Sequence, residues 1–146
     1  MPQQRTTKAI EALRTYCKDH GQRATPPREH VLDIVASADH PLTAYDVLNK
    51  LSKKLNQPKP PTAYRALEFL MQHGFIHRIE SLNSYVACGE DHKHRGSQFM
   101  ICDTCGQVEE VHLCHIPDGL QKQVNQKGFN VSYWNAELHG LCRKCN

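Results

Sequence analysis

Long hydrophobic runs are missing from this chain of 146 residues, although 39% of its residues are hydrophobic and 23% are charged. No apolar stretch approaches the roughly 20 residues that are needed to span a bilayer. The N-terminal segment, MPQQRTTKAIEALRTY, lacks the apolar region of a signal peptide. We therefore expect a globular protein that resides in the cytoplasm and does not associate with a membrane.

Cysteine is almost absent from the first part of the chain, where Cys17 is followed by none before residue 81, whereas six lie beyond that point. The excess of positive over negative charge has the opposite distribution and is found in the first part of the chain. Residues 1–80 carry 12 Lys and Arg against 8 Asp and Glu, and residues 81–146 carry 6 against 7. Seven cysteines in a cytoplasmic protein indicate thiols and metal ligands rather than disulfides. The sequence thus divides into a mildly basic part, which fits contact with a polyanion, and a part rich in metal ligands.

Four helical patterns occupy the first 75 residues, each with apolar side chains spaced three or four positions apart. They begin near Thr6, Thr25, Thr43 and Pro60, and Gly74 is placed to end the fourth. Over residues 75–88 the apolar spacing falls toward two, which predicts a β-hairpin with its turn at residues 81–84. Helices followed by a hairpin are typical of a winged helix-turn-helix domain, which we place at residues 1–88.

The remaining residues predict a hinge and a second, smaller domain. Residues 89–97 are polar and bounded by glycine, so we assign them to the hinge. Residues 98–146 are expected to form an α/β domain with strands at 98–102, 107–113 and 129–138 and a helix at 117–127. The predicted fold class is therefore α+β, with an N-terminal winged helix-turn-helix domain and a small C-terminal α/β domain.

The fourth helical pattern carries an exposed Tyr64–Arg65 pair on the face opposite its apolar stripe. Arginine can donate two hydrogen bonds to a guanine in the major groove, and tyrosine can contact a thymine methyl or a phosphate. Further side chains at or near helix starts are suited to phosphate contacts, namely Tyr45, Lys59, Arg23 and Arg28. A solvated helix face would explain the same residues, but the hairpin that follows, as a wing, favours double-stranded DNA.

Two Cys-x-x-Cys pairs, Cys102 with Cys105 and Cys142 with Cys145, carry the strongest signal for metal. Such a turn holds two thiolates at the separation of two corners of a tetrahedron around Zn²⁺. A redox pair or chance would also give one motif, but neither explains a second motif, and no surrounding βαβ pattern is present. The sequence therefore predicts a structural zinc site with four cysteine ligands.

A second set of possible ligands is more dispersed. It lies on the hairpin, in the hinge and after the first Cys-x-x-Cys pair, and comprises His77, Cys88, His92, His94, Glu109 and Glu110. One thiolate together with imidazoles and a carboxylate suits Zn²⁺, whereas Fe²⁺ or Mn²⁺ would more often have only nitrogen and oxygen ligands. Each residue taken alone is better explained as an ordinary surface side chain; as a group they predict a second metal site.

Four segments of the sequence resemble the ferric uptake regulator superfamily, and within it the zinc uptake regulator branch. They are GQRATPPREHVL (21–32), PPTAYRALEFL (60–70), CDTCGQVEE (102–110) and LHGLCRKC (138–145). The hairpin sequence, with cysteine at position 88, is particularly similar to the zinc-sensing members. The resemblance implies a homodimeric repressor of zinc-uptake genes, with a C-terminal dimerisation domain, that binds palindromic operator DNA when loaded with zinc.

Residue by residue, the resemblance implies structural zinc on the four cysteines and regulatory zinc on His77, Cys88, a hinge histidine and Glu110. It also implies DNA contacts by Tyr45, Tyr64 and Arg65. The hinge histidine of close relatives corresponds here to Arg95, one position after His94 and three after His92. We assign the ligand to His94, with His92 as the alternative.

Three rival functions remain at this point. A sensor of iron, manganese or peroxide with the same fold is the nearest, and Cys88 argues against it. A zinc enzyme acting on a small-molecule substrate would need a ligand set open to water, and the sequence contains no HExxH, nor HxE with PCxxC. A metal-storage protein or metallochaperone would have no need for Arg65. We therefore expect neither catalysis nor a small-molecule substrate.

Overall fold

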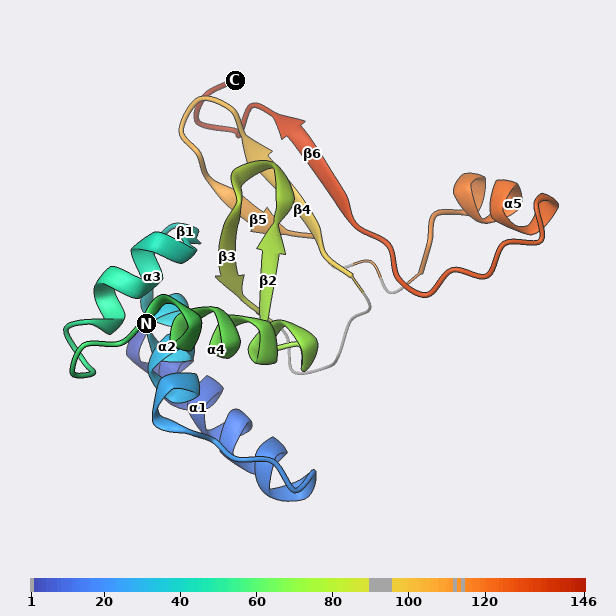
Figure 1. Ribbon diagram of the computed structural model, residues 1–146. Coiled ribbons are helices and arrows are strands. Elements are labelled where there is room, and N and C mark those ends of the chain that lie inside the picture. Colours follow the sequence, from blue (N-terminus) through green and yellow to red (C-terminus); the bar gives the residue numbers. More distant parts are fainter. Residues whose placement is uncertain (1, 90–95, 112, 114) are drawn as a thin grey trace. The chain divides into compact units, whose positions relative to one another are not determined.

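The computed structural model describes residues 2–89, 96–111, 113 and 115–146 (Figure 1). The hinge histidines His92 and His94 lie outside the described residues. The chain divides into two compact units, Met1–Cys88 and Gly89–Asn146. None of the described helices has the length and apolar character needed to cross a membrane.

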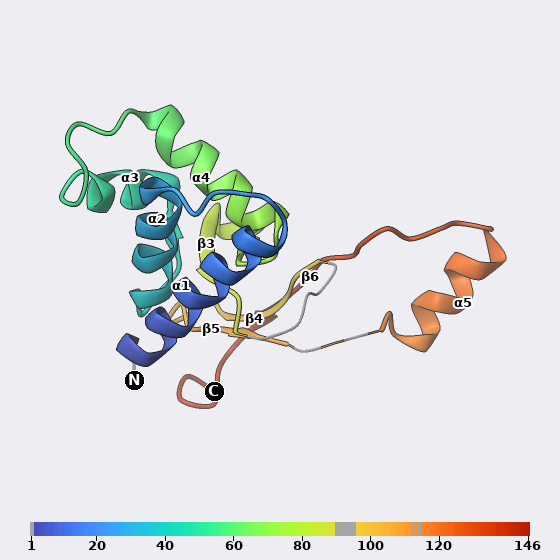
Figure 2. The same cartoon turned by 90° about the horizontal axis from the view of Figure 1, so that it is seen from below.

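The first unit consists of four helices and a small antiparallel sheet (Figure 2). The helices are α1 (Pro2–Asp19), α2 (Pro26–Ser37), α3 (Ala44–Leu51) and α4 (Pro60–Gln72). The strands are β1 (Leu42–Thr43), β2 (Ile76–Ile79) and β3 (Ser84–Ala87), in the order β1-β3-β2. A short 3-10 turn, Glu80–Leu82, joins β2 to β3. These elements form the winged helix that the sequence predicts.

Local sequence signals set the ends of these helices. Thr43 and Asp46 form a reciprocal capping box at the start of α3, each side chain bonding the backbone N–H of the other. At the end of α4 the N–H of Phe75 reaches the carbonyl of Leu70, which requires the left-handed φ of +78° at Gly74. Buried side chains from all four helices and both hairpin strands then form one core, including Leu13, Leu32, Leu51, Leu67, Leu70 and Ile76.

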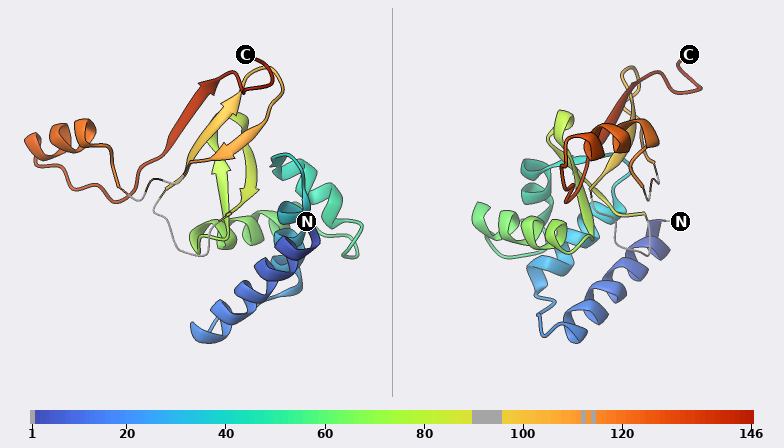
Figure 3. Two further views of the ribbon diagram at one scale, coloured as in Figure 1. Left: turned by 180° about the vertical axis from the view of Figure 1, so that it is seen from behind. Right: turned by 90° about the vertical axis from the view of Figure 1, so that its right-hand side faces the viewer.

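The second unit contains a three-stranded sheet and one helix (Figure 3). Strands β4 (Gln98–Cys102), β5 (Val108–Glu110) and β6 (Ala136–Gly140) have the order β5-β4-β6, with β5 antiparallel and β6 parallel to β4. Helix α5 (Asp118–Gln126) lies away from this sheet in Figure 1 and buries none of its residues. Phe99 and Ile101 on β4 are the centre of the small core.

The predicted fold class, α+β with a winged helix followed by a small α/β unit, is confirmed. Three details of the sequence prediction were wrong. Strand β1 was missed, because two residues carry no measurable periodicity. The last strand was placed at 129–138 and lies at 136–140. The first helix was expected to begin near Thr6, but α1 begins at Pro2.

Candidate metal centres and nucleic-acid interface

The parallel pairing of β4 with β6 brings the two Cys-x-x-Cys pairs together. In this register Cys102 lies opposite Gly140, so the turn after β4 and the turn after β6 leave the same end of the sheet. Each turn is tight: the N–H of Gly106 bonds the carbonyl of Cys102, and that of Cys145 bonds the carbonyl of Cys142. Gly106 has a φ of +74°, which favours glycine at this position.

The four-cysteine cluster, made by Cys102, Cys105, Cys142 and Cys145, has the dimensions of a tetrahedral zinc site. All four sulfur atoms lie within 4.8 Å of one another, and the Sγ atoms of Cys105 and Cys142 are 3.7 Å apart. Ligands at about 2.3 Å from a tetrahedral Zn²⁺ are separated by about 3.8 Å. The chain thus fits a closed zinc site at this position, and the assignment of the four cysteines as its ligands remains a prediction.

Electrostatics within the four-cysteine cluster also favour a cation. Backbone N–H groups of Cys105 and Cys142 lower the pKa of Cys102 to about 6, and the N–H of Cys142 lies 3.3 Å from its sulfur. The neighbouring thiol of Cys142, together with burial, raises the pKa of Cys145 to about 12. One thiolate therefore forms readily, and further thiolates beside it need a positive charge, which a divalent metal supplies.

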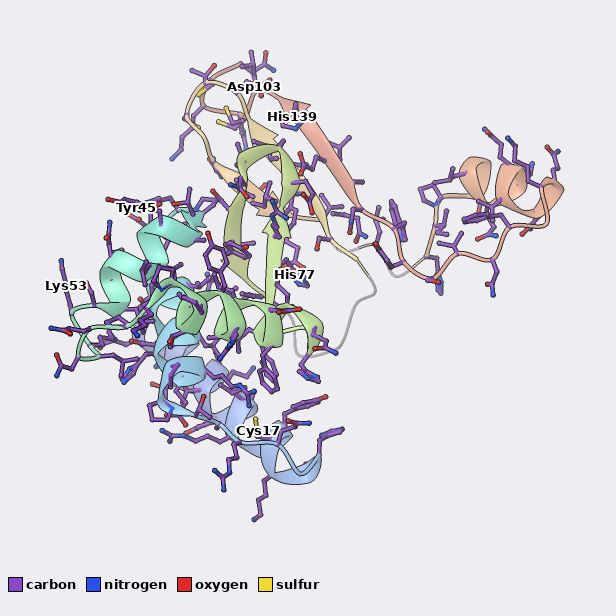
Figure 4. All side chains as sticks on the ribbon, viewed as in Figure 1. Cys17, Tyr45, Lys53, His77, Asp103 and His139 are labelled. Carbon is purple, nitrogen blue, oxygen red and sulfur yellow. The ribbon has the colours of Figure 1, made fainter. Side chains whose placement is uncertain are left out.

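His77 and Cys88 meet at the end of the hairpin where the first unit closes. His77 on β2 is paired with Val86 on β3, and the N–H of Cys88 continues the ladder by bonding the carbonyl of Phe75. The His77 side chain is buried and that of Cys88 is half-buried, and their ligand atoms lie within 4.8 Å of each other. Figure 4 shows His77 projecting from this hairpin. The pair offers one imidazole and one thiolate to a metal.

Glu110, the predicted carboxylate ligand, is held at the end of β5. It lies opposite Phe99 in the sheet, and its carboxylate accepts a hydrogen bond of 3.2 Å from the N–H of Gly89. Because Gly89 follows Cys88 directly in the chain, the carboxylate is held beside the start of the second unit. Its neighbour Glu109 lies opposite Met100 and is exposed.

The candidate DNA-facing residues lie at the starts of α3 and α4. Tyr45 is 71% exposed and Tyr64 is 57% exposed, so both aromatic rings are available for contact with a partner. Two basic residues are also exposed: Arg65, in the first turns of α4, and Lys59, the N-cap residue of that helix. The exposure of Tyr64 and Arg65 agrees with the sequence prediction that this pair lies opposite the apolar stripe of α4.

The two arginines near the start of α2 differ in their surroundings. Arg23 is exposed, whereas Arg28 is half-buried. The guanidinium of Arg28 lies 3.6 Å from the ring centre of Phe69 and donates a hydrogen bond to the carbonyl of Arg23. Arg28 thus helps to hold α2 against α4, and its predicted phosphate contact would have to use its remaining N–H groups.

Two carboxylates, those of Asp103 and Glu137, flank His139 on β6, and the sequence prediction missed this arrangement. Its two ring nitrogens lie 3.3 Å from the carboxylate of Asp103 and 3.1 Å from that of Glu137. Hydrogen bonds to Glu137 and Asp103 raise the pKa of His139. Glu137 and His139 are two residues apart on a strand, but only the register with β4 brings Asp103 to them, as labelled in Figure 4. The sequence offered no signal for that third member.

An apolar hollow of about 480 Å³ lies beside the four-cysteine cluster in the second unit. Its apolar lining comes from β4, β6 and the turn after β6, through Met100, Leu138 and Leu141. These three side chains are 44%, 57% and 55% exposed. Such a patch on a small unit is typical of an interface with another protein chain.

Comparisons with known proteins agree with this architecture. The ferric uptake regulator family model matches residues 19–139. The zinc uptake regulation protein of Escherichia coli strain K12 is 38% identical over 141 residues, which cover 96% of this chain and 82% of that protein. A solved zinc uptake regulator in complex with zinc and DNA is 37% identical, with a TM-score of 0.87 over 95% of this chain and 93% of the other. The crystal structure of holo XcZur is 36% identical, with a TM-score of 0.81 over 92% and 94% of the two chains. The chain therefore belongs to the ferric uptake regulator family.

Proposed function

We propose that this protein is a zinc-responsive transcriptional repressor that binds palindromic operator DNA as a homodimer and controls zinc-uptake genes. The observation that carries the proposal is the pairing of two features in one chain: a four-cysteine cluster and a winged helix with exposed Tyr64 and Arg65. The likeness to a zinc uptake regulator solved with zinc and DNA supports it. We further propose that it acts in the cytoplasm and is not an enzyme.

Two kinds of zinc binding have separate roles in this proposal. The four-cysteine cluster holds a structural Zn²⁺, which contributes to folding of the second unit and does not respond to small changes in free zinc. The regulatory Zn²⁺ binds His77, Cys88, a hinge histidine (His94, with His92 as the alternative) and Glu110. Because these ligands come from the hairpin, the hinge and β5, their joint binding would restrict how the winged helix is presented by a dimer.

Regulation then follows from linkage. Operator DNA binds best when the two winged helices of a dimer match successive major grooves, about 34 Å apart. Regulatory zinc and operator favour the same arrangement, so each raises the affinity for the other by the same factor. A coupling of about 1–3 kcal/mol is typical of such systems. We propose residues 1–88 as the DNA-binding domain, 89–97 as the hinge and 98–146 as the dimerisation domain.

The exposed apolar surface of the second unit supports the dimer. Helix α5 buries no residue, and its Leu120 is 45% exposed. The segment after the helix also carries the exposed Phe129 and Tyr133. The unit of 58 residues thus has a small core and much apolar surface in contact with water. A second copy of the chain would cover that surface, and two copies match the two halves of a palindromic operator.

The second candidate function is a sensor of iron, manganese or peroxide with the same fold. Cys88 beside His77 speaks against it, because a thiolate favours zinc over the harder ions. A storage role would leave the exposed Tyr64 and Arg65 without a purpose.

The proposal is tested by selecting DNA from a random duplex library with the purified protein under buffered Zn²⁺, Fe²⁺ or Mn²⁺. We expect a palindromic sequence to be enriched with zinc and not with the other ions at equal free concentration. Arg65→Ala should then lose about 1–3 kcal/mol on that operator and relax the preference at one purine of each half-site. Enrichment with iron or manganese alone would favour the second candidate, and no enrichment with any ion would remove the repressor function.

A further inference from the structure

The segment that leads from α3 into α4 is the most positively charged part of the chain. Residues 47–67 contain Lys50, Lys53, Lys54, Lys59 and Arg65 and no acidic residue, whereas the whole chain has a net charge of only +3. All five side chains are exposed. The charge is therefore concentrated next to the residues proposed to read bases, and not spread over the unit.

The loop between α3 and α4 is a built structure that fixes where these charges lie. Its backbone continues in turns, with the N–H groups of Lys54 and Leu55 both bonding the carbonyl of Leu51. Leu51 is fully buried, and Leu55 packs against the same core. The ammonium of Lys54 forms an ion pair with Asp33 on α2. The loop is thus tied to the body of the winged helix at three points.

Lys53 differs from Lys54 in having no such partner. Among the described residues, Asp33 pairs with Lys54, and none lies within ion-pair distance of the Lys53 ammonium. Figure 4 shows Lys53 at the outer edge of the loop, directed away from the unit. The N–H of Lys53 bonds the carbonyl of Lys50 at 3.2 Å, so the two lysines occupy one turn, three positions apart, which places their side chains near each other.

The start of α4 offers fewer backbone donors to a phosphate than most helix starts do. Helix N-termini ordinarily bind phosphate through free N–H groups. Here Pro60 and Pro61 occupy the first turn and remove two of those donors. Lysine side chains can replace them, because an ammonium binds a phosphate as a point charge that tolerates small shifts in position.

We propose that the α3–α4 loop, residues 52–59, is a phosphate-binding surface in which Lys53, with Lys50 on the same turn, contacts the DNA backbone beside the bases that α4 reads. The inference rests on the proposed function, since it needs α4 to lie in the major groove. The loop contributes affinity and register on the duplex but no sequence preference, because phosphates are the same at every base pair.

The test is the salt dependence of DNA binding by the full-length, zinc-loaded protein, measured on the selected operator and on a random duplex. Lys53→Gln should weaken binding to both by a similar factor. It should also reduce the slope of log affinity against log salt by about 0.9 per protomer, or about 1.8 for a dimer. Lys50→Gln should act in the same direction.

Lys18→Gln is the matched control, since it removes the same charge from the last turn of α1. Its neighbour Cys17 lies at the far end of the unit from Lys53 in Figure 4. That variant should keep the slope of the parent. A parental slope in Lys53→Gln, or equal changes in both variants, would overturn the loop proposal while the parent still bound operator. A parent that binds no DNA with zinc would instead overturn the proposed function itself.

Discussion

Among single residues, the two cysteines of the first unit differ most clearly in their surroundings. Cys17 is 2% exposed within the core, and burial raises the pKa of its thiol, so it behaves as a small apolar side chain. Cys88 is half-buried at the end of the hairpin, with a His77 ring nitrogen within 4.8 Å of its sulfur. Within one unit, the cysteine at position 17 therefore contributes to core packing, whereas the cysteine at position 88 is available to bind a metal.

Cys88→Ser should separate regulatory from structural zinc binding. Replacing a soft thiolate by a neutral hydroxyl removes a strong zinc ligand, so operator binding should require a much higher free Zn²⁺ concentration. Zinc content before titration, dimeric state and melting temperature should stay close to those of the parent, because the four-cysteine cluster is intact. The measurement is operator binding against buffered Zn²⁺.

Cys17→Ser is the control for Cys88→Ser, since it places a hydroxyl in the core. It should lower the melting temperature and leave the zinc dependence of operator binding unchanged in the folded protein. If the zinc titrations of Cys88→Ser and the parent overlap, Cys88 has no part in the sensor, and the argument for zinc over iron loses its main residue.

At the level of elements, the parallel pairing of β4 with β6 decides whether two distant motifs form one site. Each Cys-x-x-Cys turn was predictable from its own spacing, and so was the tetrahedral chemistry. The register that sets Cys102 opposite Gly140 was not, because strand β6 is short, half-exposed and without clear alternation. The winged helix was more predictable, since its capping box, its Gly74 and its apolar stripes are all local signals.

Cys145→Ser should abolish binding of the structural zinc and destabilise the pairing of β4 with β6, which the zinc holds together. Three thiolates bind zinc more weakly than four, and loss of the metal frees the turn after β6 from the turn after β4. We expect less than one zinc per chain after mild chelation, together with impaired folding or dimerisation. Asp103→Asn, in the turn after β4, is the control: this variant loses a charge beside Cys102 and should retain the metal. A stable, metal-free dimer of Cys145→Ser would contradict the structural role.

For the whole molecule, the second unit is the part that is incomplete by itself. Its described core is little more than Phe99 and Ile101, and no residue of its helix α5 is buried. A unit of 58 residues buries only a modest fraction of its surface on folding and is therefore marginally stable, so a metal or a partner would stabilise it. The four-cysteine cluster supplies one remedy and the proposed dimer the other. The sequence indicated the first through its cysteines, but the unpaired apolar surface became apparent only with the strand register.

Leu138→Lys tests whether that surface holds two copies together. Leu138 is 57% exposed on β6 and lines the apolar hollow with Met100, so a charge there would be desolvated in a dimer and would cost nothing in a monomer. We expect sedimentation to show a shift from dimer to monomer, with one zinc per chain retained. Operator affinity should fall steeply because a single winged helix contacts one half-site. Leu82→Lys, at an exposed position of the hairpin in the first unit, should leave the dimer intact. An undisturbed dimer of Leu138→Lys would move the interface away from the β4–β6 face, and the apolar hollow would then require another partner.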